Sequence, residues 1–159
     1  MASSSKRLET AQKFIRNYDT LSTEPLESLL ADNFVQQFAP ASLNPPGPLN
    51  KKDMVEHIAG LHALMSGFPL TVKEYIESES SNQVTLWATS RAIFREEVKD
   101  SGISEAEWAF EGEYIFLLWV DEKSEKVVRV VEFLDGKRTE TLLGLMQRAR
   151  ETIAKKNVT

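Results

Sequence analysis

Residues 108–135 read WAFEGEYIFLLWVDEKSEKVVRVVEFLD, which predicts two long β-strands joined by a polar turn. The second strand, residues 127–134, is rich in β-branched residues but contains the acid Glu132. A carboxylate among apolar side chains is costly to bury unless it is paired, so its presence there needs a reason. Glu132 is therefore the first candidate for a functional residue.

The turn, residues 121–125, allows the pairing of the two strands to be predicted. If Val120 pairs with Lys126, Glu132 lies directly opposite Tyr114, and opposed residues share one face of a sheet. That face then also carries apolar residues of both strands: Phe110, Phe116, Leu118, Val128 and Val130. The acid and the phenol are thus expected together in apolar surroundings, and a slip of one residue would separate them.

The composition limits the class of protein. With 159 residues and 42% hydrophobic composition, the chain has the size of one compact domain, residues 1–159. It has no cysteine, which excludes disulfides, thiolate metal sites and cysteine nucleophiles. A net charge of −5 with mixed signs argues against a nucleic-acid partner. Since the sequence shows neither a signal peptide nor a membrane-spanning apolar run, we expect a soluble cytoplasmic protein with no membrane partner.

The spacing of apolar residues predicts helices first and consecutive strands afterwards. Helical periodicity covers residues 6–21, 23–33 and 50–67 and a last helix from about residue 137. Strand-like patterns cover residues 34–39, 70–79, 83–97, 108–120 and 127–134. This order is typical of an α+β domain in which helices pack on one face of a curved antiparallel sheet.

The outward strand faces are amphipathic, which predicts a protein–protein contact. Their residues are Thr85, Trp87, Thr89, Arg91, Glu111, Glu113, Leu117 and Trp119. A second copy of the chain would cover such a surface, so we expect a homodimer.

The order of elements around EGEYIFLLWVDEKSEKVVRVVEFLDG, residues 111–136, resembles the SnoaL-like branch of the nuclear transport factor 2-like superfamily. The segments FVQQFAPASL (34–43), QVTLWATSRA (83–92), GEY (112–114) and EFLD (132–135) are similar to small fungal proteins of secondary metabolism. The resemblance covers nearly the whole chain. It implies a cone-shaped α+β barrel, with a curved antiparallel sheet wrapped around N-terminal helices and a pocket between them, and dimerisation through the sheet.

The resemblance also implies chemistry without a cofactor. Relatives of this kind cyclise, isomerise or rearrange polyketide, meroterpenoid, xanthone and indole-alkaloid intermediates. In some, a glutamate of the last strand and a tyrosine of the preceding strand line the pocket, and these correspond to Glu132 and Tyr114. Other relatives use a basic residue near the first strand and a second tyrosine, but this chain has Gln36, Gln37 and Phe38 in the first region and Phe110 in the second. The histidine and carboxylate patterns of the scytalone dehydratase and ketosteroid isomerase branches do not transfer either.

An apolar environment raises the pKa of a carboxyl toward neutrality, where it can accept and return a proton. Tyr114 would then donate a hydrogen bond to a substrate oxygen as negative charge develops. The structural alternative is that Glu132 pairs with Arg91 or Arg129 and only satisfies the sheet. Strand position alone leaves both interpretations open, and the resemblance favours catalysis.

Residues predicted to bind the substrate are Phe38, Phe110, Phe116, Tyr18, Arg91 and His57. Competing interpretations place Tyr18 in the core, Arg91 on the outer face and His57 in the core or on the surface. His57 and His62 are five residues apart on one helix, which directs them away from a common ion, so no metal site is predicted. No glycine-rich phosphate loop or dinucleotide fingerprint occurs, and no cofactor is expected.

The sequence therefore predicts a cofactor-independent isomerase or cyclase that acts on a hydrophobic secondary-metabolite intermediate. The alternative is a module of the same fold that binds a small molecule without chemistry or works through its dimer surface, because fold does not determine function.

Overall fold

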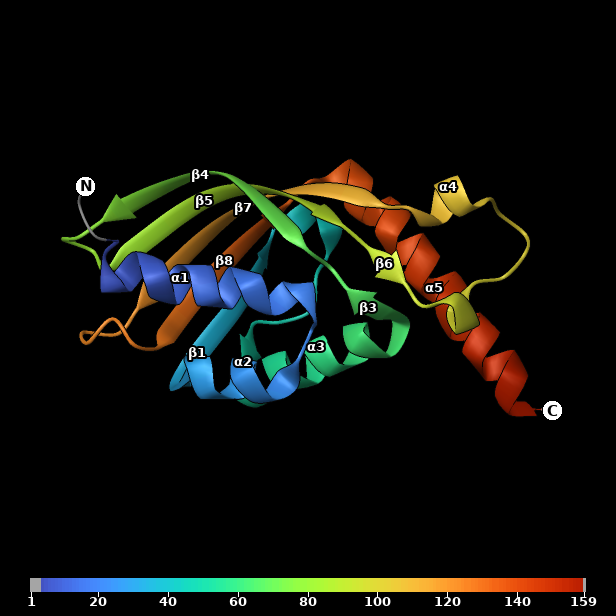
Figure 1. Ribbon diagram of the computed structural model, residues 1–159, viewed down its shortest axis with the longest axis horizontal. Helices are drawn as coiled ribbons and strands as arrows, with labels where there is room; N and C mark the ends of the chain where they lie inside the picture. Colours follow the sequence, from blue (N-terminus) through green and yellow to red (C-terminus); the bar gives the residue numbers. More distant parts are fainter. Residues whose placement is uncertain (1–3, 159) are drawn as a thin grey trace.

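The structure, a computed structural model, describes residues 4–158 and has the predicted α+β architecture. The helices are α1 (Lys6–Arg16), the 3-10 turn η1 (Asn17–Asp19), α2 (Thr23–Leu29), the 3-10 turn η2 (Ala41–Leu43), α3 (Lys51–Leu64), the 3-10 turn η3 (Glu96–Val98), α4 (Glu105–Trp108) and α5 (Gly136–Val158). The strands are β1 (Leu30–Ala39), β2 (Leu49–Asn50), β3 (Met65–Gly67), β4 (Leu70–Ser78), β5 (Gln83–Arg91), β6 (Ile93–Phe94), β7 (Glu111–Val120) and β8 (Val127–Leu134). Figure 1 shows β4, β5, β7 and β8 curving side by side over α1, with α5 crossing one end of the sheet.

The main sheet has the order β2-β1-β8-β7-β5-β4 and is mixed. Its neighbours are antiparallel except β1 and β8, which run parallel, whereas an antiparallel sheet was predicted. These two strands lie at opposite ends of the sheet-forming sequence, so no hairpin constrains their relative direction. The parallel pairing places Phe38 beside Glu132 and Gln36 beside Val130.

The β7–β8 hairpin differs from its predicted register by two residues. Glu132 pairs with Phe116, and Tyr114 pairs with Leu134, so the prediction that Glu132 lies directly opposite Tyr114 is wrong. An irregularity next to the turn, where Val120 pairs with Val127, shifts the ladder. Because side chains alternate with a period of two, this shift leaves Glu132 and Tyr114 on the same inward face.

Several predicted element ends also differ. The second helix, α2, ends at Leu29 instead of residue 33, and β1 begins at Leu30 instead of residue 34. The strand predicted from Trp108 begins at Glu111, because residues 105–108 form α4, which Ser104 and Glu107 cap reciprocally. The third predicted helix ends at Leu64, and Met65–Gly67 pair as β3 with β6. Gly67 is required there, since a Cβ atom would lie 2.3 Å from the backbone oxygen of Asp19. This close approach holds η1 against the chain that leads into β4.

The core lies between the inward sheet face and helices α1, α2 and α3. Alternate residues of β5 and β7 are buried, among them Val84, Leu86, Phe116 and Leu118, as period two requires. Phe14 and Ile15 of α1 pack into the same cluster. None of the helices within residues 4–158 has the length and apolar character that a membrane span needs.

Candidate functional site

A cavity of about 310 Å³ lies between the inward sheet face, α3, α5 and the loop that follows β1. Its apolar lining comes from these elements and consists of Phe38, Leu43, Pro45, Pro46, Leu61, Met65, Phe68, Leu134, Leu142, Leu143 and Met146. The polar lining residues are Tyr18, Asn44, His57, Tyr114, Glu132, Thr139 and Arg150. An apolar cleft with a few convergent polar groups is the usual form of a small-molecule site.

Glu132 lies in the wall of this cavity and is only 8% exposed. Its Oε1 accepts hydrogen bonds from the Tyr18 hydroxyl at 3.3 Å and from Nε2 of Gln36 at 3.2 Å. No arginine or lysine of residues 4–158 forms an ion pair with it. The two alternative partners lie elsewhere, since Arg129 stacks over Trp119 and Arg91 lies on the outer face. The structural alternative of a salt-bridged Glu132 is therefore excluded.

The two donors act on the same carboxylate oxygen, which distinguishes the two oxygens of Glu132. Oε2 accepts no hydrogen bond from a described residue, and it is not among the fully enclosed polar atoms that lack a partner. Oε1 is thus held by neutral donors, while Oε2 remains available to a ligand. A proton that exchanges with a substrate would reside on Oε2.

Burial raises the pKa of Glu132 from its ordinary 4.5 to about 7, while the hydrogen bonds from Tyr18 and Gln36 act in the opposite direction. The burial cost of the charge dominates because both partners are neutral. Both forms of Glu132 are therefore populated near neutral pH, which suits a group that accepts and returns a proton.

The side chain of Gln36 is fully buried next to Glu132. Its Nε2 donates to Glu132, but its Oε1 has no hydrogen-bond partner among the described residues. A buried unpaired acceptor lowers stability. Gln36 therefore stabilises the carboxylate of Glu132, while its own unpaired Oε1 lowers the stability of the folded protein.

Tyr18 reaches Glu132 because η1 is tied to the segment before β4. The amide of Phe68 donates to the carbonyl of Tyr18 at 2.8 Å, and the Tyr18 ring packs against Phe116 with centroids 6.2 Å apart. Burial and the neighbouring Glu132 raise the pKa of Tyr18 well above its usual value. Tyr18 thus remains a neutral hydrogen-bond donor.

The hydroxyl of Tyr114 is held by a hydrogen bond from Ser90. The Ser90 hydroxyl donates to Tyr114 Oη at 3.0 Å and itself accepts from the amide of Gly112 at 3.2 Å. Burial raises the pKa of Tyr114 above its usual value, with smaller contributions from neighbouring charges, so the phenol keeps its proton. Since no described residue accepts that proton, it remains free for an acceptor in the cavity.

His57 and Arg150 lie on α3 and α5 where these helices border the cavity. The His57 ring packs against Phe38, with centroids 5.4 Å apart. Burial, and then the charge of Arg150, lower the pKa of His57, so its imidazole is neutral at neutral pH.

The structure therefore brings together four of the predicted side chains besides Glu132, namely Tyr114, Tyr18, Phe38 and His57. Phe110 and Phe116, which were also predicted to bind the substrate, do not line the cavity. Phe110 stacks behind Phe68, and Phe116 lies beneath the rings of Tyr18 and Tyr114. Both are buried in the core behind the cavity wall, and position on the inward face did not distinguish these two layers.

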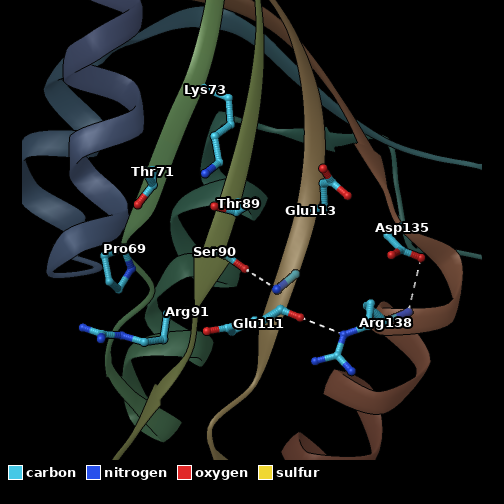
Figure 2. A pocket seen from close by; sticks show the side chains of 11 residues that line it. Pro69, Thr71, Lys73, Thr89, Ser90, Arg91, Glu111, Glu113, Asp135 and Arg138 are labelled. Atoms are coloured by element: carbon cyan, nitrogen blue, oxygen red, sulfur yellow. Dashed lines mark hydrogen bonds between the residues drawn. The ribbon is translucent and has the colours of Figure 1, made fainter.

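Arg91 lines a second, polar cavity of about 770 Å³ that opens on the outward sheet face, and it does not line the cavity that contains Glu132. Figure 2 shows the side chains of this cavity, which come from β4, β5, β7 and α5, from Pro69 just before β4 and from Asp135 just before α5. Within this cavity, Nε of Arg138 donates a hydrogen bond to the backbone oxygen of Glu111 at 2.8 Å. The lining mixes cations with acids and lacks both Glu132 and Tyr114.

Several residues of the site were not predicted from the sequence. The wall contributed by α5 includes Leu142, Met146 and Arg150, and Phe68 comes from a connection between strands. The amphipathic pattern of α5 was visible, but its docking position was not. Ser90 gave one signal, since it is a polar residue at an inward position of β5.

No three His, Asp or Glu side chains within residues 4–158 are grouped as ligands of a metal ion would be. The cavity contains one carboxylate, one imidazole and one guanidinium. The chemistry that these groups support directly is proton transfer and hydrogen bonding.

Comparison with known proteins identifies the fold. No family model matches the chain, and no curated protein matches its sequence. Among solved structures, it is similar to AusH from Aspergillus nidulans, with 24% identity over 85% of this chain and 87% of that chain and a TM-score of 0.69. It is also similar to the BvnE pinacolase from Penicillium brevicompactum, with 21% identity, coverage of 91% and 96%, and a TM-score of 0.75. PrhC from Penicillium brasilianum shows 17% identity, coverage of 92% and 91%, and a TM-score of 0.74.

Likeness of this extent over nearly complete chains establishes a common architecture. The chain has the SnoaL-like, nuclear transport factor 2-like fold.

Proposed function

We propose that the protein is a cofactor-independent isomerase or cyclase of a hydrophobic secondary-metabolite intermediate, with Glu132 as its proton-transfer group. The observation that carries the proposal is a carboxyl in an apolar cavity whose Oε1 is held by neutral donors and whose Oε2 is open to a ligand. A pinacolase has the same fold, which supports a catalytic use of such a cavity.

In the proposed reaction, Oε2 of ionised Glu132 removes a proton from an acidic carbon or hydroxyl of the substrate. The Tyr114 hydroxyl donates a hydrogen bond to the substrate oxygen on which negative charge develops. The protonated Glu132 then returns the proton at another atom, which completes an isomerisation or follows ring closure. Tyr18 and Gln36 hold the carboxyl in place through Oε1.

The test compares the native protein with Glu132→Gln, which keeps the shape of the side chain and its acceptor oxygen but cannot take up a proton. Both are incubated with polyketide, meroterpenoid and indole-alkaloid intermediates in D₂O, and products are analysed by mass spectrometry. The native protein should convert one substrate class, with incorporation of deuterium wherever Glu132 returns the proton to a carbon atom, and the variant should lose at least about 10²-fold in rate. Equal turnover by a folded Glu132→Gln variant would overturn the assignment.

We also propose that the protein is a homodimer formed through the outward sheet face. Trp87, Ile115 and Phe133 lie in one row across β5, β7 and β8 and are 42%, 38% and 50% exposed. A contiguous apolar row on a soluble domain favours association with a second copy.

A further inference from the structure

Arg150 lines the Glu132 cavity but has no role in the proposed proton transfer. Two lining residues are charged side chains, Glu132 and Arg150, and they differ in their surroundings. Glu132 is buried, whereas Arg150 is exposed on α5 and therefore lies on the solvent side of the cavity. The rest of the lining is largely apolar and includes Phe38 and Met146.

Arg150 has no acidic partner on its own helix. The positions three and four residues away, which are the neighbours of a helical side chain, carry Met146, Gln147, Ile153 and Ala154. It forms no ion pair with any residue of 4–158. Arg148, two residues earlier, does have such a partner and pairs with Asp100 at 2.7 Å.

His57, which lies near Arg150, does not neutralise the positive charge of Arg150. His57 lines the same part of the cavity, and burial together with Arg150 keeps it neutral by lowering its pKa. A neutral imidazole adds a hydrogen-bonding group to the guanidinium. Arginine binds carboxylates through parallel hydrogen bonds, which makes such a pair directional.

We infer that the ligand of this cavity is a hydrophobic carboxylic acid, whose carboxylate binds Arg150 beside His57 while its apolar body extends toward Glu132. This inference rests on the proposed function for the role of Glu132, but the binding of the carboxylate does not depend on turnover. A cavity of about 310 Å³ accommodates a bicyclic body of this kind.

The experiment measures binding of 2-naphthylacetate and of its uncharged methyl ester by isothermal titration calorimetry. The native protein should bind the acid about tenfold more tightly than the ester, and Arg150→Gln should lose this preference while it binds the ester unchanged. Lys155→Gln is the matched control, because it removes one positive charge from the same helix at a residue that does not line the cavity. It should retain the preference.

Equal affinity of the native protein for acid and ester, or no binding of either, would overturn the inference. A preference that persists in Arg150→Gln would also overturn it. Glu132→Gln separates the two proposals: it should still prefer the acid. If that variant also retained turnover, the proposed function would fail while the carboxylate site remained.

Discussion

Nε2 of Gln36 lies 3.2 Å from Oε1 of Glu132, so a neutral amide occupies a position from which a lysine or arginine would hold the carboxylate ionised. This contact limits how far burial raises the pKa of Glu132. It also links the side chains of β1 and β8, which pair in parallel.

Replacement of Gln36 by leucine should raise the pKa of Glu132 above its value of about 7, by roughly one pH unit, because the ionised form loses a donor. If ionised Glu132 is the base, kcat/KM of the native protein rises with pH through about 7 and then levels, and the Gln36→Leu profile is displaced to higher pH. Titration of the Glu132 carboxyl by ¹³C NMR provides a second readout without substrate. An unchanged midpoint in both measurements would remove Gln36 from this role.

Glu132→Gln should change folding stability in a pH-dependent manner. The folded pKa of about 7 lies above the ordinary 4.5, so the unfolded chain releases the proton first as pH rises. The native protein therefore loses stability between about pH 4.5 and 7, up to about 3 kcal/mol, and the glutamine variant does not. Denaturant unfolding at pH 4 and pH 8 should show similar stabilities at pH 4 and a more stable variant at pH 8. A native protein whose stability rose with pH relative to the variant would contradict the raised pKa.

Gly112→Ala should displace the phenol of Tyr114. The added Cβ would lie 2.5 Å from Tyr114 Oη and 3.0 Å from Ser90 Oγ, in a buried part of the sheet. We expect a loss of turnover similar to that of Tyr114→Phe, about tenfold, and little further loss in the double variant. Gly144→Ala is the control, since no atom lies within 4 Å of its added Cβ, and it should leave turnover unchanged. Additive losses would show that Gly112 acts through another group.

Ile115→Glu should convert the proposed dimer into a monomer, because it places a charge in the centre of the row formed with Trp87 and Phe133. Ile93→Glu is the control variant. Ile93 and Ile115 have nearly the same exposure, 39% and 38%, but Ile93 lies in the separate β3–β6 sheet. Size-exclusion chromatography with light scattering should give a dimer for the native protein and Ile93→Glu. A monomeric native protein at working concentration would exclude the interface.

Part of the site could be predicted because successive side chains of a β-strand point to opposite faces of the sheet, which depends only on the local backbone. Glu132 and Tyr114 were placed on one inward face, and that placement remained correct although the register was wrong by two residues. An error of one residue would have reversed it. The sequence did not distinguish Phe110 and Phe116, which lie behind the cavity wall, from Phe38, which lines the cavity, because all three were expected to bind the substrate.

The sequence by itself determined the α+β class, the apolar face of each strand and the presence of an acid on such a face, since these follow from periods of two and 3.6 residues along the chain. Only the tertiary structure decided that β1 runs parallel to β8, that Gln36 and Tyr18 donate to one oxygen of Glu132, and that Arg150 borders the cavity. Gln36 and Tyr18 lie 96 and 114 positions from Glu132 in the sequence. These relationships depend on how complete elements dock, and docking is determined by the packing of the whole core rather than by any local pattern.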